Sequence, residues 1–188
     1  KVLLNGEDIT NLPTHARVKK GLCRSFQVVN VFPELSVFNN IQIPVLSRIG
    51  RAGSFFGSVR GEKQAIEEVE QILEQVGLAE RAQALATALS HGDQRLLEVG
   101  IALAAQPQLL FLDEPTAGMN PVERVEILQN IRRLSEAKIT TFVIVEHDMD
   151  IVFSLSDRVV VLHRGDIICD GGPSHVQNDA GVRECYLG

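Results

Sequence analysis

The sequence contains no tryptophan and a single tyrosine, although it has eight phenylalanines in 188 residues. Proteins that hold single-stranded nucleic acid stack its bases on aromatic side chains, and proteins that hold duplexes place clustered lysines and arginines on the phosphates. Here 24 acidic residues outnumber 18 lysines and arginines, which gives a formal net charge of -6. The composition therefore argues against a nucleic-acid partner.

Cysteine and long apolar runs are also scarce. The three cysteines, Cys23, Cys169 and Cys185, share no metal-ligand spacing, and an odd number without a signal-peptide layout indicates reduced thiols in the cytosol. No apolar run approaches the ~20 residues that a membrane-spanning helix needs. We therefore expect any role at a membrane to come through a partner protein.

What is present is the composition of a globular protein, with 45% apolar and 22% charged residues. The short apolar run 109–112 is typical of a strand buried on both faces, and 140–145 is a second, β-branched apolar run that predicts a strand. Residues 121–136 between them predict a helix. Alternating strands and helices indicate an α/β fold with a parallel sheet. In the N-terminal part we expect strands at 2–5 and 22–26, a turn at 6–8 and a helix at 13–19. In the C-terminal part we expect a hairpin of 159–162 with 167–169 and a last helix at 175–186.

From about Val37 to Ala105 the periodicity becomes helical. Apolar residues recur at the 3.6-residue period in one helix, and Gly77 follows as its C-terminal cap. Residues 50–61 are rich in glycine and predict a loop. A second helix is expected from about Asp93 to Ala105, after Ser90. The members of the first apolar stripe are Ile66, Val69, Ile72, Leu73 and Val76.

Two acids, Asp113 and Glu114, follow the buried run at 109–112. Ligands of open α/β sheets bind beyond the carboxyl ends of the strands, so the two acids stand where a ligand is expected. Successive strand side chains point to opposite faces, so one carboxylate can hold Mg²⁺ through water while the other faces an attacking water. Taken alone, the pair fits a solvated strand end before a turn somewhat better.

Other polar positions carry weaker signals. His147 follows the run 140–145 and can contact a phosphate, although a histidine there is more often a capping residue, and Asp148 suits the N-cap of the next helix. Ser90 can cap a helix whose first amides form an anion site, and it can equally be a plain cap. Gln27 can ligate Mg²⁺ or orient water through its amide, or it can be polar surface.

In their order and spacing, these positions resemble the ATP-binding cassette ATPases. Gln27 matches the Q-loop of that family. Residues 89–94 match its signature motif, which is usually LSGGQ, with His91 and Asp93 as departures.

The C-terminal half continues the resemblance. Residues 109–114 match the Walker B strand and its catalytic glutamate, residues 118–120 match the D-loop, and His147 matches the switch histidine. A finer similarity connects the chain with the ATPases of branched-chain amino acid importers. It is carried by Arg24–Gln27, Phe32–Val37, Ala117–Pro121, Glu146–Met149 and Tyr186–Gly188.

The resemblance implies an α/β P-loop NTPase core of the RecA-like type, with a mainly parallel sheet and an α-helical subdomain. Residues 1–38 would belong to the N-terminal lobe, 39–105 to the helical subdomain and 106–188 to the RecA-like lobe. ATP and Mg²⁺ would be bound in a head-to-tail dimer with a second ATPase subunit. The partners would be transmembrane permease subunits and, indirectly, a substrate-binding protein, at the cytoplasmic face of the inner membrane.

The resemblance also implies a role for each matched residue. Glu114 would polarise the attacking water, and His147 would stabilise the γ-phosphate. Asp113 and Gln27 would serve Mg²⁺. The remaining nucleotide contacts would come from the signature and the D-loop, through Ser90, His91, Gly92, Asp93, Gln94, Gly118 and Asn120.

One part of the family pattern has no match. A phosphate-binding loop needs the run G-x-x-x-x-G-K-[ST], and the sequence has none, because Glu62 separates Gly61 from Lys63. We expect an N-terminal truncation that also removes the loop's strand and leaves an exposed sheet edge. The chain alone is expected neither to bind ATP tightly nor to hydrolyse it.

Several alternatives stay open. Importers of urea and amides share much of the pattern, and the lipopolysaccharide-export ATPase shares the C-terminal ending. A soluble cassette ATPase of DNA repair would carry long heptad insertions, and one of translation would carry two cassettes, neither of which occurs here. A non-catalytic binding module would not need Glu114 and His147.

Overall fold

A computed structural model gives the fold of the protein and describes residues 1–25, 30–50 and 59–187. The chain divides into two compact units, Lys1–Val143 and Ile144–Gly188. This division differs from the three functional parts expected from the sequence, which stay a prediction.

The first unit begins with a small hairpin of β1, Leu3–Leu4, and β2, Glu7–Asp8. Asn5 and Gly6 connect the strands with φ angles of 52° and 82°, as a tight hairpin turn requires. The sequence predicted the first strand but treated residues 6–8 as a turn alone, which is wrong because the chain folds straight back on itself. Helix α1, Thr14–Lys19, follows Pro13 as expected.

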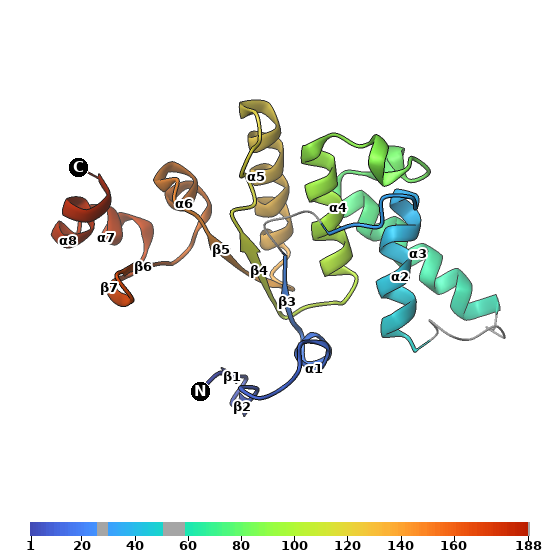
Figure 1. Ribbon diagram of the computed structural model, residues 1–188, viewed down its shortest axis with the longest axis horizontal. Helices are drawn as coiled ribbons and strands as arrows, with labels where there is room; N and C mark the ends of the chain where they lie inside the picture. The colour runs from blue at the N-terminus through green and yellow to red at the C-terminus, as the bar shows by residue number, and fades with distance from the viewer. Residues whose placement is uncertain (26–29, 51–58, 188) are drawn as a thin grey trace. The chain divides into compact units, whose positions relative to one another are not determined.

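A three-stranded sheet has the strand order β3-β4-β5, and all of it except the last two residues of β5 belongs to the first unit. Strand β3, Leu22–Arg24, pairs in parallel with β4, Leu109–Asp113, so that Leu22 lies opposite Leu109. Strand β5 is Thr141–Val145. The strands expected at 109–112 and 140–145 are confirmed, and the expected parallel pairing is found between β3 and β4 (Figure 1). The strand expected at 22–26 ends at Arg24, and Phe26 lies outside the described residues.

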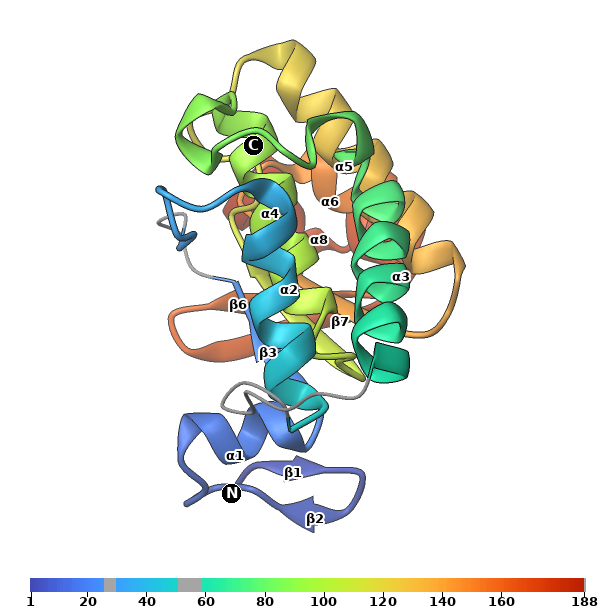
Figure 2. The same cartoon turned by 90° about the vertical axis from the view of Figure 1, so that its right-hand side faces the viewer.

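Three helices pack together beside this sheet, as Figure 2 shows for α2, Val37–Arg48, α3, Val59–Val76, and α4, His91–Leu103. Helices α4 and α2 approach each other closely at Gly100 of α4. A Cβ added to this glycine would lie only 3.1 Å from Cδ1 of Ile41 in α2. The buried apolar residues include Val37, Ile41 and Val45 of α2, Ala65, Val69, Ile72, Leu73 and Val76 of α3, and Leu96, Leu97 and Val99 of α4.

Helix α3 differs from its sequence prediction at one end and agrees with it at the other. It begins at Val59, so the loop predicted for residues 50–61 is wrong over its last three residues. One glycine costs a helix only about 1 kcal/mol, and the buried stripe of α3 outweighs it. At the other end Gly77 has φ 78°, and the amide of Leu78 donates to the carbonyl of Leu73 at 2.8 Å, which is a glycine C-cap.

Two short 3₁₀ turns, η1 at Ala79–Arg81 and η2 at Ala86–Ala88, lead from α3 to α4. The first amides of α2 hold this connection, because Phe38 donates to the carbonyl of Ala82 and Val37 to that of Ala84, both at 2.9 Å. Helix α5, Pro121–Glu136, runs over the predicted range and caps the end of α3, since Asn130 donates to the Val76 carbonyl at 3.0 Å.

The second unit contains helix α6, Met149–Leu155, and an antiparallel hairpin of β6, Val159–His163, with β7, Asp166–Gly171. The predicted hairpin is confirmed, and both residues of its turn, Arg164 and Gly165, have positive φ angles. Its small core consists of Val159, Cys169, Val176 and Val182, with Val152, Phe153 and Val161 packed against it. On β7, a hydrogen bond from Arg158 lowers the pKa of Asp170.

The single C-terminal helix predicted for residues 175–186 is wrong. The structure has α7, Pro173–Asn178, and α8, Ala180–Val182, followed by a π-helical turn at Arg183–Leu187. Asp179 separates the helices because its Oδ1 accepts from the amide of Val182 at 3.0 Å and begins a new helix.

Neither a disulfide nor a membrane-spanning helix occurs in the described part of the chain. All three cysteines are unpaired, and burial raises the pKa of the Cys23 thiol. Within the described residues, no helix is both long and apolar enough to cross a membrane.

Leu110 tests the packing of the sheet, because its side chain is fully buried in β4. Leu110→Ala removes this packing and leaves a cavity, so we expect the free energy of unfolding to fall by about 3 kcal/mol. Urea unfolding followed by circular dichroism measures the change. Val122→Ala, at a position that is 68% exposed, is the control and is expected to change stability by less than about 0.5 kcal/mol. Equal losses in both variants would contradict the assigned core.

Candidate functional site

Two acidic residues lie at the carboxyl end of β4, where the sequence predicted them. Asp113 is the last residue of the strand, and its Oδ2 accepts a hydrogen bond from Nη2 of Arg24 at 2.7 Å. Because β3 and β4 are parallel, both side chains reach the same edge of the sheet. The Asp113 side chain is 29% exposed, so its carboxylate is accessible to a ligand.

Glu114 has the left-handed φ angle of 43°. A non-glycine residue in this region costs about 1 kcal/mol, and such residues gather at functional sites. The carbonyl of Glu114 accepts from the amide of Ala117 at 3.0 Å, which closes a turn directly after the strand. The chain thus turns sharply at Glu114, directly after Asp113. Glu114 therefore does not continue the pattern in which successive side chains of β4 point to opposite faces of the sheet.

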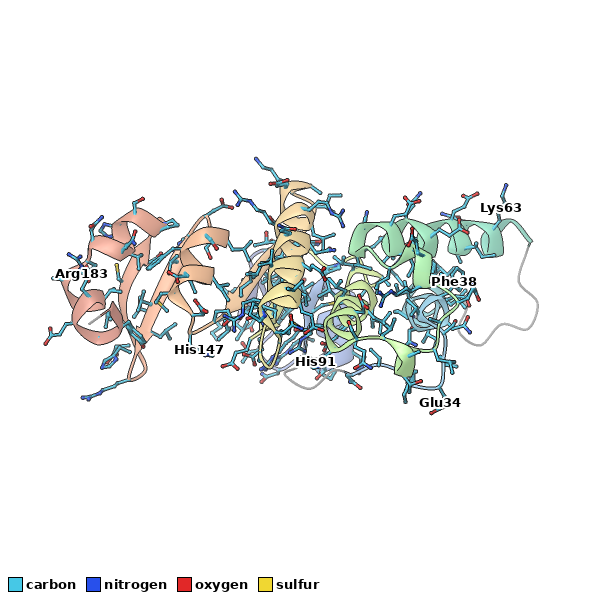
Figure 3. All side chains as sticks on the ribbon, turned by 90° about the horizontal axis from the view of Figure 1, so that it is seen from above. Glu34, Phe38, Lys63, His91, His147 and Arg183 are labelled. Carbon is cyan, nitrogen blue, oxygen red and sulfur yellow. The ribbon has the colours of Figure 1, made fainter. Side chains whose placement is uncertain are left out.

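The signature segment forms the beginning of α4. Ser90 is the N-cap, and its Oγ accepts from the amide of Asp93 at 3.1 Å. The earlier amides of the first turn have no partner within the helix, as at any helix N-terminus. Ser90 and His91 are exposed, and His91 is labelled in Figure 3. The predicted helix start at about Asp93 lies two residues too late because the serine cap begins the helix at His91.

The D-loop segment lies against the signature segment of the same chain. An added Cβ on the buried Gly92 would meet Cγ of Glu123 at 3.2 Å, and one on Gly118 would lie 3.9 Å from Nε2 of His91. Glu123 also accepts from the amide of Asn120 at 3.3 Å, while Asn120 Oδ1 accepts from the amides of residues 122 and 123. This capping box starts α5 directly beside the start of α4.

Two signature positions make contacts within the protein. The Asp93 carboxylate pairs with the Arg81 guanidinium of η1. The side-chain amide of Gln94 donates to the carbonyl of Ala86 at 3.1 Å. Both contacts connect the start of α4 to the segment between α3 and α4.

Two other predicted site residues, Gln27 and His147, lie outside the described part of the first unit. Gln27 lies outside the described residues. His147 is exposed in the second unit, and the next residue, Asp148, caps α6 as predicted, accepting from the amide of Asp150 at 3.1 Å. The expected convergence of His147 with Asp113 and Glu114 stays a prediction.

Sequence reasoning missed Arg24, Arg81 and Glu123 as neighbours of the site. Arg24 and Asp113 are 89 residues apart, so no local pattern connects them. The Glu123 contact had a signal, because asparagine followed three residues later by glutamate is a capping-box pattern.

The donor set at the sheet edge fits a magnesium ion that is bound together with a nucleotide. Among the described residues, no group of three histidines, cysteines or acids could hold a metal ion by itself. Magnesium is usually held by one or two carboxylates together with phosphates and waters, so Asp113 alone is sufficient on the protein side.

The family described as ABC transporter matches residues 1–117, which include the signature segment, Asp113 of β4 and Glu114 directly after it. The chain belongs to the ABC transporter family.

Curated ABC relatives match over the full chain. The chain is 34% identical to the high-affinity branched-chain amino acid transport ATP-binding protein LivG of Escherichia coli, and it covers 75% of that protein. It is 35% identical to the corresponding protein BraF of Pseudomonas aeruginosa, again over 75% of its length.

Solved structures share the fold. MJ1267, an ATP-binding cassette of an ABC transporter, has a TM-score of 0.77 at 31% identity, with 98% of this chain and 75% of that chain covered. The chain cbiO1 from Clostridium perfringens has a TM-score of 0.78 at 24% identity over 98% and 71% of the two chains, and supports the fold alone. The predicted P-loop NTPase fold of an ABC ATPase is thereby confirmed.

Asn120 tests the junction between the D-loop and α5. Asn120→Ala removes the acceptor of two helix amides, so we expect a loss of about 1 kcal/mol in the free energy of unfolding. Asn120→Asp keeps an acceptor and is expected to retain the stability. Urea unfolding monitored by circular dichroism distinguishes these results. An alanine variant as stable as the aspartate variant would show that the cap is not needed.

Proposed function

We propose that this chain is the ATP-binding subunit of an importer of branched-chain amino acids and that it couples ATP hydrolysis to transport. One observation carries the proposal: identity of 34–35% over the whole chain to ATP-binding proteins of that transport system, LivG and BraF. The two acids at the carboxyl end of β4 and the serine-capped start of α4 support the ATPase part.

In this proposal Glu114 is the general base. Its carboxylate would accept a proton from the water that attacks the γ-phosphate, and Asp113 would hold Mg²⁺ together with Gln27. Arg24 would release Asp113 when the ion binds, since both compete for the same carboxylate. His147 would hydrogen-bond the γ-phosphate.

The start of α4 would act on the nucleotide of a second ATPase subunit in a head-to-tail dimer. Ser90 Oγ accepts from Asp93, which leaves its hydroxyl proton available for a phosphate oxygen. The amides of His91 and Gly92 belong to the first turn of α4, where anions are favoured. Contacts between the D-loop and the signature within one chain would make the two move together.

The permease subunits would dock on the surface beside α2, at the cytoplasmic face of the membrane. Phe32 and Leu85 are 53% and 48% exposed, and both lie on segments held together by backbone bonds. The amide of Ala86 donates to the carbonyl of Leu35 at 3.0 Å, and buried Asn40 donates to the Phe32 carbonyl at 3.0 Å. A rigid apolar surface of this kind suits a helix presented by a permease.

Glu114→Gln in the intact subunit, assembled with its transport partners, tests the assignment of the base. An amide cannot accept the proton, so we expect the ATP hydrolysis rate to fall by about 100-fold or more while nucleotide still binds. Size-exclusion chromatography with MgATP is expected to show a trapped ATPase dimer.

The matched control is Glu136→Gln, which changes an exposed carboxylate at the far end of α5. This variant is expected to hydrolyse ATP at the rate of the unchanged protein. Full hydrolysis by Glu114→Gln would overturn the assignment of Glu114.

A second expectation concerns the 188 residues by themselves, which contain no G-x-x-x-x-G-K-[ST] run. The backbone amides and the lysine of that run are the main contacts of the β- and γ-phosphates. We expect calorimetric titration of the chain with MgATP to give a dissociation constant above about 100 μM. This corresponds to a binding free energy that is less favourable than about −5.5 kcal/mol. Binding in the low micromolar range would contradict this expectation.

One alternative has an observation in its favour. The chain is 30% identical over its full length to the lipopolysaccharide export system ATP-binding protein LptB of Haemophilus influenzae, and it covers 74% of that protein. Co-purification of the chain with its permease subunits would decide between an importer and an exporter.

A further inference from the structure

The signature segment carries a negative charge where an anion is expected to bind. Asp93 lies in the first turn of α4, and its own amide donates to the N-cap Ser90. An acid in this turn stabilises the helix itself, because the N-terminus carries a partial positive charge. The same acid also repels a phosphate that approaches the first amides of the helix.

Other acids lie close to this helix start. The Glu123 side chain covers Gly92, and Glu126 lines the same groove of about 480 Å³ as Asp93. Arg133 also lines the groove, and its Nη2 donates to the carbonyl of Gln75 at 2.6 Å. Acidic and basic side chains thus both surround the start of α4, and the ionic partner of Asp93 itself is Arg81.

Arg81 meets the Asp93 carboxylate through Nη1. Its backbone position is fixed, because η1 follows the glycine cap of α3 and the carbonyls of Ala82 and Ala84 accept from the first amides of α2. The Arg81 side chain is 54% exposed and that of Asp93 only 17%, so the acid is the more buried partner of the pair.

We propose that Arg81 is a positioning residue that neutralises Asp93 and thereby keeps the start of α4 able to accept a nucleotide phosphate. This inference rests on the proposed function, because it concerns the phosphate that the signature helix would receive. The alternative is that the ion pair only clamps η1 to α4 and that its charge is irrelevant.

Charge neutralisation and clamping predict opposite results for a set of variants. Arg81→Gln leaves Asp93 unneutralised, and we expect the KM for MgATP of the intact subunit in its transport complex to rise about 10-fold. Because the pair is partly exposed, raising the salt from about 50 mM to about 300 mM is expected to shrink this effect. Arg81→Lys keeps the charge and is expected to stay within about 3-fold of the unchanged protein.

Asp93→Asn and the double variant Arg81→Gln with Asp93→Asn decide between the two explanations. Asp93→Asn breaks the clamp but leaves a cation beside the helix start, so neutralisation predicts a lower KM and clamping a higher one. The double variant has neither charge, and neutralisation predicts a KM within about 3-fold of the unchanged protein. A double variant as impaired as Arg81→Gln, or a raised KM in Asp93→Asn, would overturn the inference.

Two controls separate this test from stability and from the proposed function. Arg132→Gln removes an arginine from an exposed ion pair with Glu136 and is expected to leave KM unchanged. Thermal unfolding of each variant shows whether it folds; if Arg81→Gln does not, the sign of the KM change in Asp93→Asn still decides. If the complex shows no ATPase activity that Glu114→Gln abolishes, the proposed function itself is refuted. If the complex is active but Asp93→Asn does not restore the KM of Arg81→Gln, only the role of Arg81 is refuted.

Discussion

The structure of the first unit depends on a strand, β4, whose alternate apolar side chains are buried and whose end is polar. Leu110 and Leu112 of β4 are almost completely buried, and the next two residues are Asp113 and Glu114. Burial fixes the strand by its apolar side chains, and the fixed strand then determines where the acids stand. The left-handed turn at Glu114 is tolerated because the strand before it and the turn after it are both well packed or hydrogen-bonded.

A second constraint holds the beginnings of α4 and α5 together. The absence of a side chain on Gly92 lets Glu123 pack against the first turn of α4. Glu123 in turn completes the capping box of Asn120, so one side chain serves both helix starts. The Glu123 side chain and the approach of Gly118 to His91 thus hold the starts of α4 and α5 side by side within this chain.

Much of the fold could be predicted from the sequence because its signals are local. The strands β4 and β5, the bounds of α5, the cap at Gly77 and the hairpin of β6 with β7 all follow from apolar runs, periodicity and turn chemistry. The break at Asp179 was missed because an aspartate that caps a helix also occurs inside polar helix faces. The start of α3 was missed because its buried stripe extends the helix through Gly61.

The site could be predicted less completely, since its supporting contacts are long-range. Asp113, Glu114 and Ser90 stand where motif spacing indicated. The partners of Asp113 and Gly92, Arg24 and Glu123, come from other segments and depend on tertiary packing. The resemblance assigned Gln94 to the nucleotide, and this assignment stays a prediction; in the structure the side-chain amide of Gln94 donates to the carbonyl of Ala86.

The central claim is that the acids after β4 and the imidazole after β5 serve one nucleotide. A crystal structure of the intact Glu114→Gln subunit with MgATP tests it most directly. The account predicts that residue 114 and His147 both lie within about 4 Å of the γ-phosphate or of the water in line with it. Placement of the two side chains at opposite edges of the sheet, with only one of them near the nucleotide, would contradict it.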